Sequence, residues 1–266
     1  MSPSWTHLVR FVAEEDNEIH LGQVDASQYP DVGLATLEGR KVKAKVVIGD
    51  VFDGRVTEDV LHIKHTLKTL QLLSPVTADQ VLIIRCMGLN YRDHAKEANM
   101  PIPEVPVLFI KPRTALTGPY PSTINIPKVS QDGSSDYEAE LSLVLSKSGR
   151  DIPEEEAMDY VLGYTCSNDV SARKQQFKNS QWCFSKAIYN DQVVQDSNTK
   201  EMIFTIPQMI SFLSQGTTLE KGTIIMTGTG PGIGVMRDPP ITLNDGDDMR
   251  IEISEIGTLV NRVRYE

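Results

Sequence analysis

Cysteine and aromatic residues are scarce in this chain, and basic residues are fewer than acidic ones. Of its 266 residues, 3 are cysteine and 6% are aromatic. Cys86, Cys166 and Cys183 are odd in number, lie far apart and contain no CxxC pair. This pattern argues against a disulfide framework. We therefore expect reduced thiols, as in a cytosolic protein.

Long apolar runs and basic clusters are also missing. No run of apolar residues is long enough to span a membrane, and residues 1–18 turn acidic early without the apolar core of a secretion signal. The 26 Lys and Arg residues face 36 Asp and Glu, which gives a formal net charge of −10. Nucleic acids and anionic membranes bind basic patches. We expect a cytoplasmic protein with neither kind of partner.

Two common enzyme signatures do not occur. The chain contains no GxSxG, which argues against a serine-hydrolase elbow, and Ser171 and Lys174 match SxxK without the partner motifs of that enzyme class. The glycine-rich residues 227–234 have the wrong spacing for a dinucleotide fingerprint, and residues 238–240 (DPP) rather than a helix follow them. The backbone amides and threonine hydroxyls of such a loop can still hold a carboxylate.

What the chain does contain suits an ordinary globular protein. It is 40% hydrophobic and 23% charged, which allows one large domain, or a large domain with a small one, around a sizeable core. In residues 1–80, strand-like runs at 7–12 and 43–48 alternate with Gly and Asp turns, a helix is predicted at 57–72, and residues 73–77 are typical of a linker. Further strands are predicted at 81–86, 107–110, 141–145, 161–166, 223–226 and 249–253, and a helix at 208–215.

A pair of glutamates precedes the buried strand at 141–145. Glu138 and Glu140 are two residues apart, and side chains in a strand alternate between faces, so both point the same way. Two like charges on a core strand are costly unless a cation joins them. The alternative is a solvated strand end. Asp169 follows the strand at 161–166, a position where catalytic groups are often placed.

A histidine and a glutamate are spaced for contact on one helical face. His94 and Glu97 are three residues apart in a segment of helix-forming character. A carboxylate that holds the imidazole in one tautomer makes the ring a general base for water. The alternative is a surface ion pair on an exposed helix.

Seven motifs in order resemble the fumarylacetoacetate hydrolase family. They are GLNYRDHAKEA, DYEAEL, GYTCSNDVSAR, QWCFSK, QDSNT, TGTGPGIG and IGTLVNRVRYE. The resemblance covers residues 81–266, and residues 1–80 are similar to the small N-terminal domain of two-domain members. It implies a mixed, β-rich α+β fold: a fumarylacetoacetase-like β-roll or barrel with a small N-terminal α+β domain. Members are usually homodimers.

The same resemblance implies a metal site and its surroundings. Three oxygen ligands without Cys or His suit Mg²⁺ or Mn²⁺, or else Ca²⁺. An anionic 2-oxo acid can chelate such an ion through its keto and carboxylate oxygens, with added cations to balance the charge. The resemblance assigns Glu138, Glu140 and Asp169 to the metal, Lys186 to the active-site lysine, His94 and Glu97 to the water-activating dyad, and Arg173, Thr229 and Tyr91 to the substrate.

The chain departs from the family pattern after Lys186. The family continues there for a few dozen residues, whereas here Lys186 is followed at once by Ala187 and the turn at Asn190-Asp191. The missing stretch should hold part of the central sheet and one wall of the active site. Either the site is genuinely trimmed or the sequence comes from a skipped exon.

The resemblance favours a metal-dependent enzyme of small 2-oxo or 2,4-dioxo acids. The expected chemistry is C–C hydrolysis of an acylpyruvate-like compound or decarboxylation of oxaloacetate. A tautomerase or isomerase, and a lyase of secondary metabolism, are alternatives within the family. A non-catalytic dimeric protein is the alternative from another class, because of the missing segment. His94 and Glu97 favour hydrolysis over tautomerisation alone.

Overall fold

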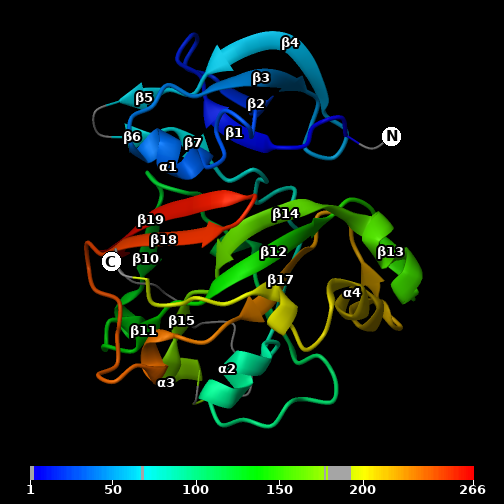
Figure 1. Ribbon diagram of the computed structural model, residues 1–266, viewed down its shortest axis with the longest axis vertical. Coiled ribbons are helices and arrows are strands. Elements are labelled where there is room, and N and C mark those ends of the chain that lie inside the picture. Colours follow the sequence, from blue (N-terminus) through cyan, green and yellow to red (C-terminus); the bar gives the residue numbers. More distant parts are fainter. Residues whose placement is uncertain (1–2, 67–68, 177, 179–192) are drawn as a thin grey trace.

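The computed structural model describes residues 3–66, 69–176, 178 and 193–266. Figure 1 shows a sheet of blue and cyan strands at one end of the molecule and the helix α2 (Arg92–Glu97) at the other. The three-stranded sheet that contains β18 and β19 and the five-stranded sheet that contains β12 and β14 lie between them. The chain has the β-rich fumarylacetoacetate hydrolase fold that the sequence predicts. Among the described helices, none has the length and apolar character needed to cross a membrane.

The N-terminal sheet has the order β4-β3-β2-β1-β7. Strand β3 shows why it forms: Ala44 is buried between the exposed Lys43 and Lys45, and Val47 is buried as well because the register shifts between Lys45 and Val47. The elements of this part are β1 (Leu8–Val12), β2 (Ile19–Gln23), α1 (Val32–Leu37), β3 (Lys43–Ile48), β4 (Arg55–His62), β5 (His65–Thr66), β6 (Thr69–Leu70) and β7 (Leu72–Leu73).

The helix predicted at 57–72 is wrong. Residues 55–62 form strand β4, which pairs antiparallel with β3. Val56, Thr57 and Val60 are β-branched and suit a strand, and the open edge of β3 offers backbone partners that a surface helix lacks. Tertiary pairing here overrides the helix propensity of the surrounding Leu, Lys and Glu residues.

Helix α1 attaches the N-terminal part to the rest of the chain. Asp31 caps the helix by accepting from Leu34 N at 2.8 Å, and the same carboxylate accepts from Thr258 N at 3.1 Å and Thr258 Oγ1 at 2.5 Å. The helix approaches so closely that a Cβ on Gly33 would lie 1.8 Å from Thr258 O. We retain a domain boundary near residue 80 as a proposal.

The central sheet has the order β14-β12-β17-β8-β9. Its strands β8 (Ile84–Met87), β9 (Leu108–Lys111), β12 (Ala139–Leu145), β14 (Val161–Asn168) and β17 (Ile224–Thr229) confirm the predicted strands to within a few residues. Both faces of β12 are buried: Leu143 and Leu145 pack in one cluster with helix α4 (Ile206–Ser214), and Val144 packs in another with Met226. Strand β12 therefore runs between two hydrophobic clusters, one on each face of the central sheet.

A second, three-stranded sheet of order β10-β19-β18 covers part of the central one. Helix α4 begins with a capping box made by Thr205 and Gln208, a strong helix start. Cys86 and Cys166 are free thiols. The remaining elements are β10 (Thr123–Ile126), β11 (Ser135–Asp136), β13 (Gly149–Arg150), β15 (Ser171–Ala172), β16 (Thr218–Leu219), β18 (Asp248–Ile253), β19 (Gly257–Tyr265), α3 (Arg173–Gln176), η1 (Arg113–Ala115), η2 (Lys128–Ser130), η3 (Glu154–Tyr160), η4 (Thr199–Glu201) and η5 (Gly234–Met236).

Candidate metal centre and active site

The three predicted acidic ligands converge. Glu138, Glu140 and Asp169 are all buried, and one carboxylate oxygen from each lies within 4.8 Å of the others. The strand register brings them together: β12 pairs with β14 so that Ala139 faces Asn168, and Asp169 N donates to Glu138 O at 2.9 Å. The alternative of a solvated strand end is therefore excluded for this pair.

A buried lysine beside the cluster was not predicted from the sequence. Lys111 Nζ lies 2.5 Å from Asp169 Oδ1 and donates to Val170 O at 3.3 Å. Lys111 ends β9, in which Phe109 and Lys111 are buried and Leu108 and Ile110 are exposed. An alternating strand that places a lysine on its buried face is a signal that could have identified it.

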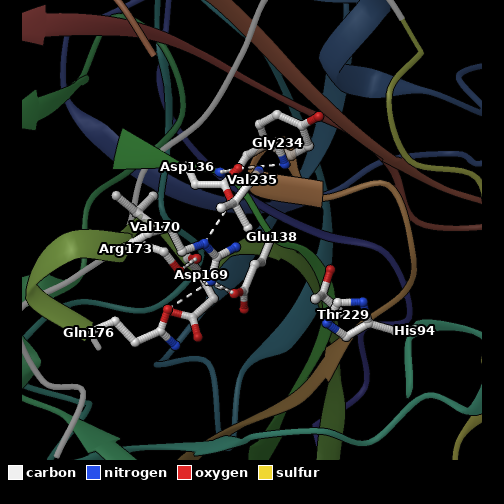
Figure 2. Close-up of polar contacts among 12 residues, drawn as sticks. His94, Asp136, Glu138, Asp169, Val170, Arg173, Gln176, Thr229, Gly234 and Val235 are labelled. Carbon is white, nitrogen blue, oxygen red and sulfur yellow. Dashed lines mark hydrogen bonds and ion pairs between the residues drawn. The ribbon is translucent and has the colours of Figure 1, made fainter. Parts of the chain in front are cut away.

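Asp136 is a fourth buried acid, held by Arg173. Arg173 Nε donates to Asp136 Oδ2 and its Nη1 to Glu138 Oε1, both at 2.6 Å, as Figure 2 shows. Burial alone would lower the pKa of Arg173, but the charges of Glu138 and Asp136 outweigh it and raise that pKa. Burial raises the pKa of Asp136, against the opposing effect of Arg173. Arg173 is therefore a permanent cation that fixes one metal-ligand candidate.

The balance of buried charge fits a divalent cation. Within the described residues, this site gathers four acidic and two basic groups, and buried charge is costly unless it is paired. Carboxylate oxygens are also the donors that hard divalent ions prefer. The residues in this balance are Asp136, Glu138, Glu140, Asp169, Lys111 and Arg173.

Replacing Arg173 by methionine is expected to destabilise the protein by about 3–5 kcal/mol, because it leaves two buried carboxyl groups without their cation. Thermal or urea unfolding of the metal-free protein measures the change. Arg150→Met is the matched control, since Arg150 pairs with Asp151 on the surface. Equal stability of the two variants would contradict the structural role of Arg173.

The buried Nη2 of Arg173 has no hydrogen-bond partner among the described atoms. Its predicted contact with a substrate anion remains a proposal.

The glycine-rich residues 227–234, which run from the end of β17 into the loop that follows, hold carboxylates of the protein itself. Gly228 N donates to Glu140 Oε2 at 2.8 Å, and Gly234 N donates to Asp136 Oδ1 at 2.7 Å. Gly232 N donates to Glu97 Oε1 at 2.8 Å. Backbone donors therefore orient one candidate ligand, its neighbouring acid and the dyad glutamate from a single segment.

The predicted dyad forms on α2. His94 Nδ1 lies 3.0 Å from Glu97 Oε2, with the two side chains 12% and 25% exposed. A carboxylate only accepts, so Nδ1 carries the proton and Nε2 is left with its lone pair. Glu97 is exposed, but the hydrogen bond from Gly232 N ties it to the glycine-rich residues, which distinguishes the pair from an isolated surface ion pair.

Thr229 and Tyr91, which the sequence predicts to contact the substrate, lie in different surroundings. The Thr229 hydroxyl donates to Ala139 O at 3.0 Å and accepts from Gln195 Nε2 at 2.8 Å, so its single O–H is already engaged. Tyr91 is buried in the hydrophobic cluster next to α4, and burial raises its pKa to about 12. Substrate contacts of Thr229 and Tyr91 stay predictions. Lys186 and the junction that follows it lie outside the described residues.

The chain belongs to the fumarylacetoacetate hydrolase family. The model of the fumarylacetoacetate hydrolase C-terminal domain matches residues 83–189 and 186–264, in two parts that meet at the junction after Lys186.

Relatives with named activities cover most or all of the chain. Caffeoylpyruvate hydrolase of Neonothopanus nambi is 44% identical over 283 aligned positions, which span 100% of this chain and 96% of that protein. The mitochondrial oxaloacetate tautomerase of Xenopus laevis is 39% identical over 73% of this chain and 68% of its own length. The 2-hydroxyhepta-2,4-diene-1,7-dioate isomerase of Mycobacterium marinum has a similar structure, with a TM-score of 0.76, 26% identity and 98% of each chain covered.

Proposed function

We propose that this chain is a divalent-metal-dependent hydrolase that cleaves a C–C bond of acylpyruvate-like 2,4-dioxo acids. The observation that carries the proposal is the buried carboxylate cluster together with the His-Glu pair of α2, both of which accept hydrogen bonds from the glycine-rich residues 227–234. The 44% identity to a caffeoylpyruvate hydrolase supports the substrate class. A homodimer in the cytoplasm is part of the same proposal.

Glu138, Glu140 and Asp169 would hold the ion, with Mg²⁺ as the first choice. An ion bound there supplies Lewis acidity to the keto and carboxylate oxygens of the substrate, where negative charge develops during cleavage. Lys111 and Arg173 hold two of the ligand carboxylates in place. The spare Nη2 donor of Arg173 and, as predicted, Lys186 would meet the substrate anion.

The dyad supplies the base. Water adds to the acyl carbonyl, and the bond between that carbon and the methylene carbon of the pyruvate part breaks. The bonding electron pair stays with the methylene carbon, which takes up a proton, so that an acyl carboxylate and pyruvate are released. His94 Nε2 takes the proton from the attacking water, while Glu97 accepts from Nδ1 and stabilises the imidazolium that forms.

The direct test is turnover of acetylpyruvate by the purified chain with Mg²⁺, followed by the loss of the absorbance of its enol form. Release of acetate and pyruvate in equal amounts is expected, and chelation of the metal should stop it. Conversion without pyruvate release, or no conversion at all, would contradict the hydrolase proposal.

Replacing His94 by alanine is expected to lower hydrolysis by about 10²–10⁴-fold, the typical contribution of a general base. Mg²⁺ affinity should stay unchanged, because His94 is not among the clustered carboxylates. Assay and calorimetry on the same preparation measure both quantities. His62→Ala is the matched control, since His62 also pairs with a glutamate, Glu15, but in the N-terminal sheet. A His94→Ala protein that hydrolyses normally would exclude the dyad from catalysis.

A second candidate function is keto–enol exchange of oxaloacetate. The identity to oxaloacetate tautomerases favours it, and it needs no attacking water. Oxaloacetate exchange that survives in His94→Ala would show that this reaction, unlike hydrolysis, does not use the dyad.

A further inference from the structure

The carboxylate cluster and the dyad lie on separate segments that meet at one residue. Gly232 donates its N–H to Glu97 Oε1 at 2.8 Å, and its carbonyl accepts from the Tyr137 hydroxyl at 2.8 Å. Tyr137 stands in the chain immediately before Glu138. Gly232 therefore joins the helix that carries His94 to the segment that carries the metal-ligand candidates.

The backbone at Gly232 fits no other residue. Its φ is +95°, and a Cβ there would lie 2.1 Å from Val194 O, so a side chain would be both strained and blocked. Its orientation is set by hydrogen bonds to its own N–H and carbonyl. Besides Tyr137, Arg237 Nε approaches the carbonyl at 3.4 Å, a long and correspondingly weak contact.

Tyr137 is placed to act as a rigid donor. It is 3% exposed and packs among apolar side chains that include Ile126 and Met249. A buried phenol needs a hydrogen-bond partner, and a carbonyl can only accept, so the hydroxyl donates to Gly232. Its other side-chain contact, Arg237, can only donate, so turning the ring away would leave the hydroxyl proton without this acceptor.

Helix α2 is anchored at both ends by such contacts. In its first turn, Ser197 Oγ donates to Asp93 Oδ2 at 2.6 Å, and Arg92 Nη1 donates to Met202 O at 2.5 Å. In its last turn, Glu97 accepts from Gly232 N. His94 lies between these anchors, and the second one ties it to the carboxylate cluster.

We propose that Tyr137 is a positioning residue for hydrolysis: its hydroxyl fixes Gly232, which holds Glu97 and so aims His94 Nε2 at the carboxylate cluster. This inference rests on the proposed hydrolase function. Tyr137 touches neither substrate nor water in this role. Its loss should affect the step that needs an aligned base and should spare metal binding and keto–enol exchange.

The test compares Tyr137→Phe with the wild type. A misplacement of about 1 Å can cost 10²-fold in rate, so we expect kcat for acetylpyruvate hydrolysis to fall by about 10–100-fold, with KM, Mg²⁺ affinity and oxaloacetate exchange unchanged. Amide hydrogen exchange of the metal-free protein should be faster in residues 92–98 and 228–235. Tyr265→Phe is the matched control, because it removes a hydroxyl that donates to a backbone carbonyl, Leu243 O, at 2.6 Å; it should change none of these.

The outcomes separate the two proposals. Wild-type kcat in Tyr137→Phe, or equal losses of hydrolysis, exchange and Mg²⁺ affinity, would overturn the positioning role. If the wild type hydrolyses nothing, the proposed function fails on its own. Hydrogen exchange then decides the contact: faster exchange in both segments supports the Tyr137–Gly232–Glu97 connection, and unchanged exchange overturns it.

Discussion

Replacing Glu140 by glutamine is expected to abolish Mg²⁺ binding and, with it, both hydrolysis and keto–enol exchange. The amide keeps the shape of the side chain and can still accept from Gly228 N, but it removes one of three anionic oxygen donors. Loss of an outer partner of a metal ligand typically costs 10–100-fold in affinity, so loss of a ligand should exceed about 100-fold. Isothermal titration calorimetry with Mg²⁺ and Mn²⁺ measures this directly.

The control for this substitution is Glu58→Gln. Glu58 pairs with Lys45 on the surface and its side chain is 92% exposed, so the same chemical change there should leave the titration unaltered. A Glu140→Gln protein that binds Mg²⁺ with wild-type affinity would exclude this cluster as the metal site.

In the absence of metal, Glu140→Gln should raise the thermal stability of the protein, although it abolishes metal binding. Without an ion, three carboxylates within 4.8 Å of one another repel. Glu140→Gln relieves part of that repulsion, and we expect the metal-free variant to melt at a higher temperature than the metal-free wild type. A cluster that is costly without its ion is typical of a functional site rather than of a stabilising network.

Local spacing predicted which side chains could meet, and the family resemblance assigned them as metal ligands and as the dyad. Glu138 and Glu140 lie on one side because strand side chains alternate, and His94 and Glu97 meet because residues three apart share a helical face. Both patterns depend on a few neighbouring residues, so the structure reproduces them with little influence from distant parts of the chain.

Residues that act through distant partners could not be predicted in this way. Lys111 reaches Asp169 although β9 and β14 are the two outer strands of the central sheet, and Asp136 meets Gly234 across 98 residues of chain. The helix predicted at 57–72 failed for the same reason: pairing with β3 decides the conformation of β4. Tertiary partners, which no spacing encodes, determined each of these outcomes.

The junction after Lys186 bears on the stability of the whole domain. The alignment with the hydrolase from Neonothopanus nambi has 283 positions against 266 residues here, and the family model matches in two parts that meet at 186–189. Among the described strands, β14 is an edge of the central sheet. A cavity of about 1180 Å³ lies beside it, with Val144, Leu162 and Met226 in its wall. The longer alignment and the division of the family match support the prediction that a stretch of the family pattern is missing after Lys186.

The 266-residue chain is therefore expected to be markedly less stable than a version with a family-like segment inserted after Lys186, and to be the less active of the two. Strands of a core contribute on the scale of a domain's whole stability, roughly 5–15 kcal/mol. Thermal unfolding, sedimentation and binding of a hydrophobic dye compare the two forms. The short form should melt at a lower temperature and bind more dye.

An insertion of equal length rich in Gly and Ser is the control, because it restores chain length without apolar strands. A short form that unfolds cooperatively at high temperature as a stable dimer would show instead that the trimmed barrel is a complete architecture, and the non-catalytic alternative would lose its main support.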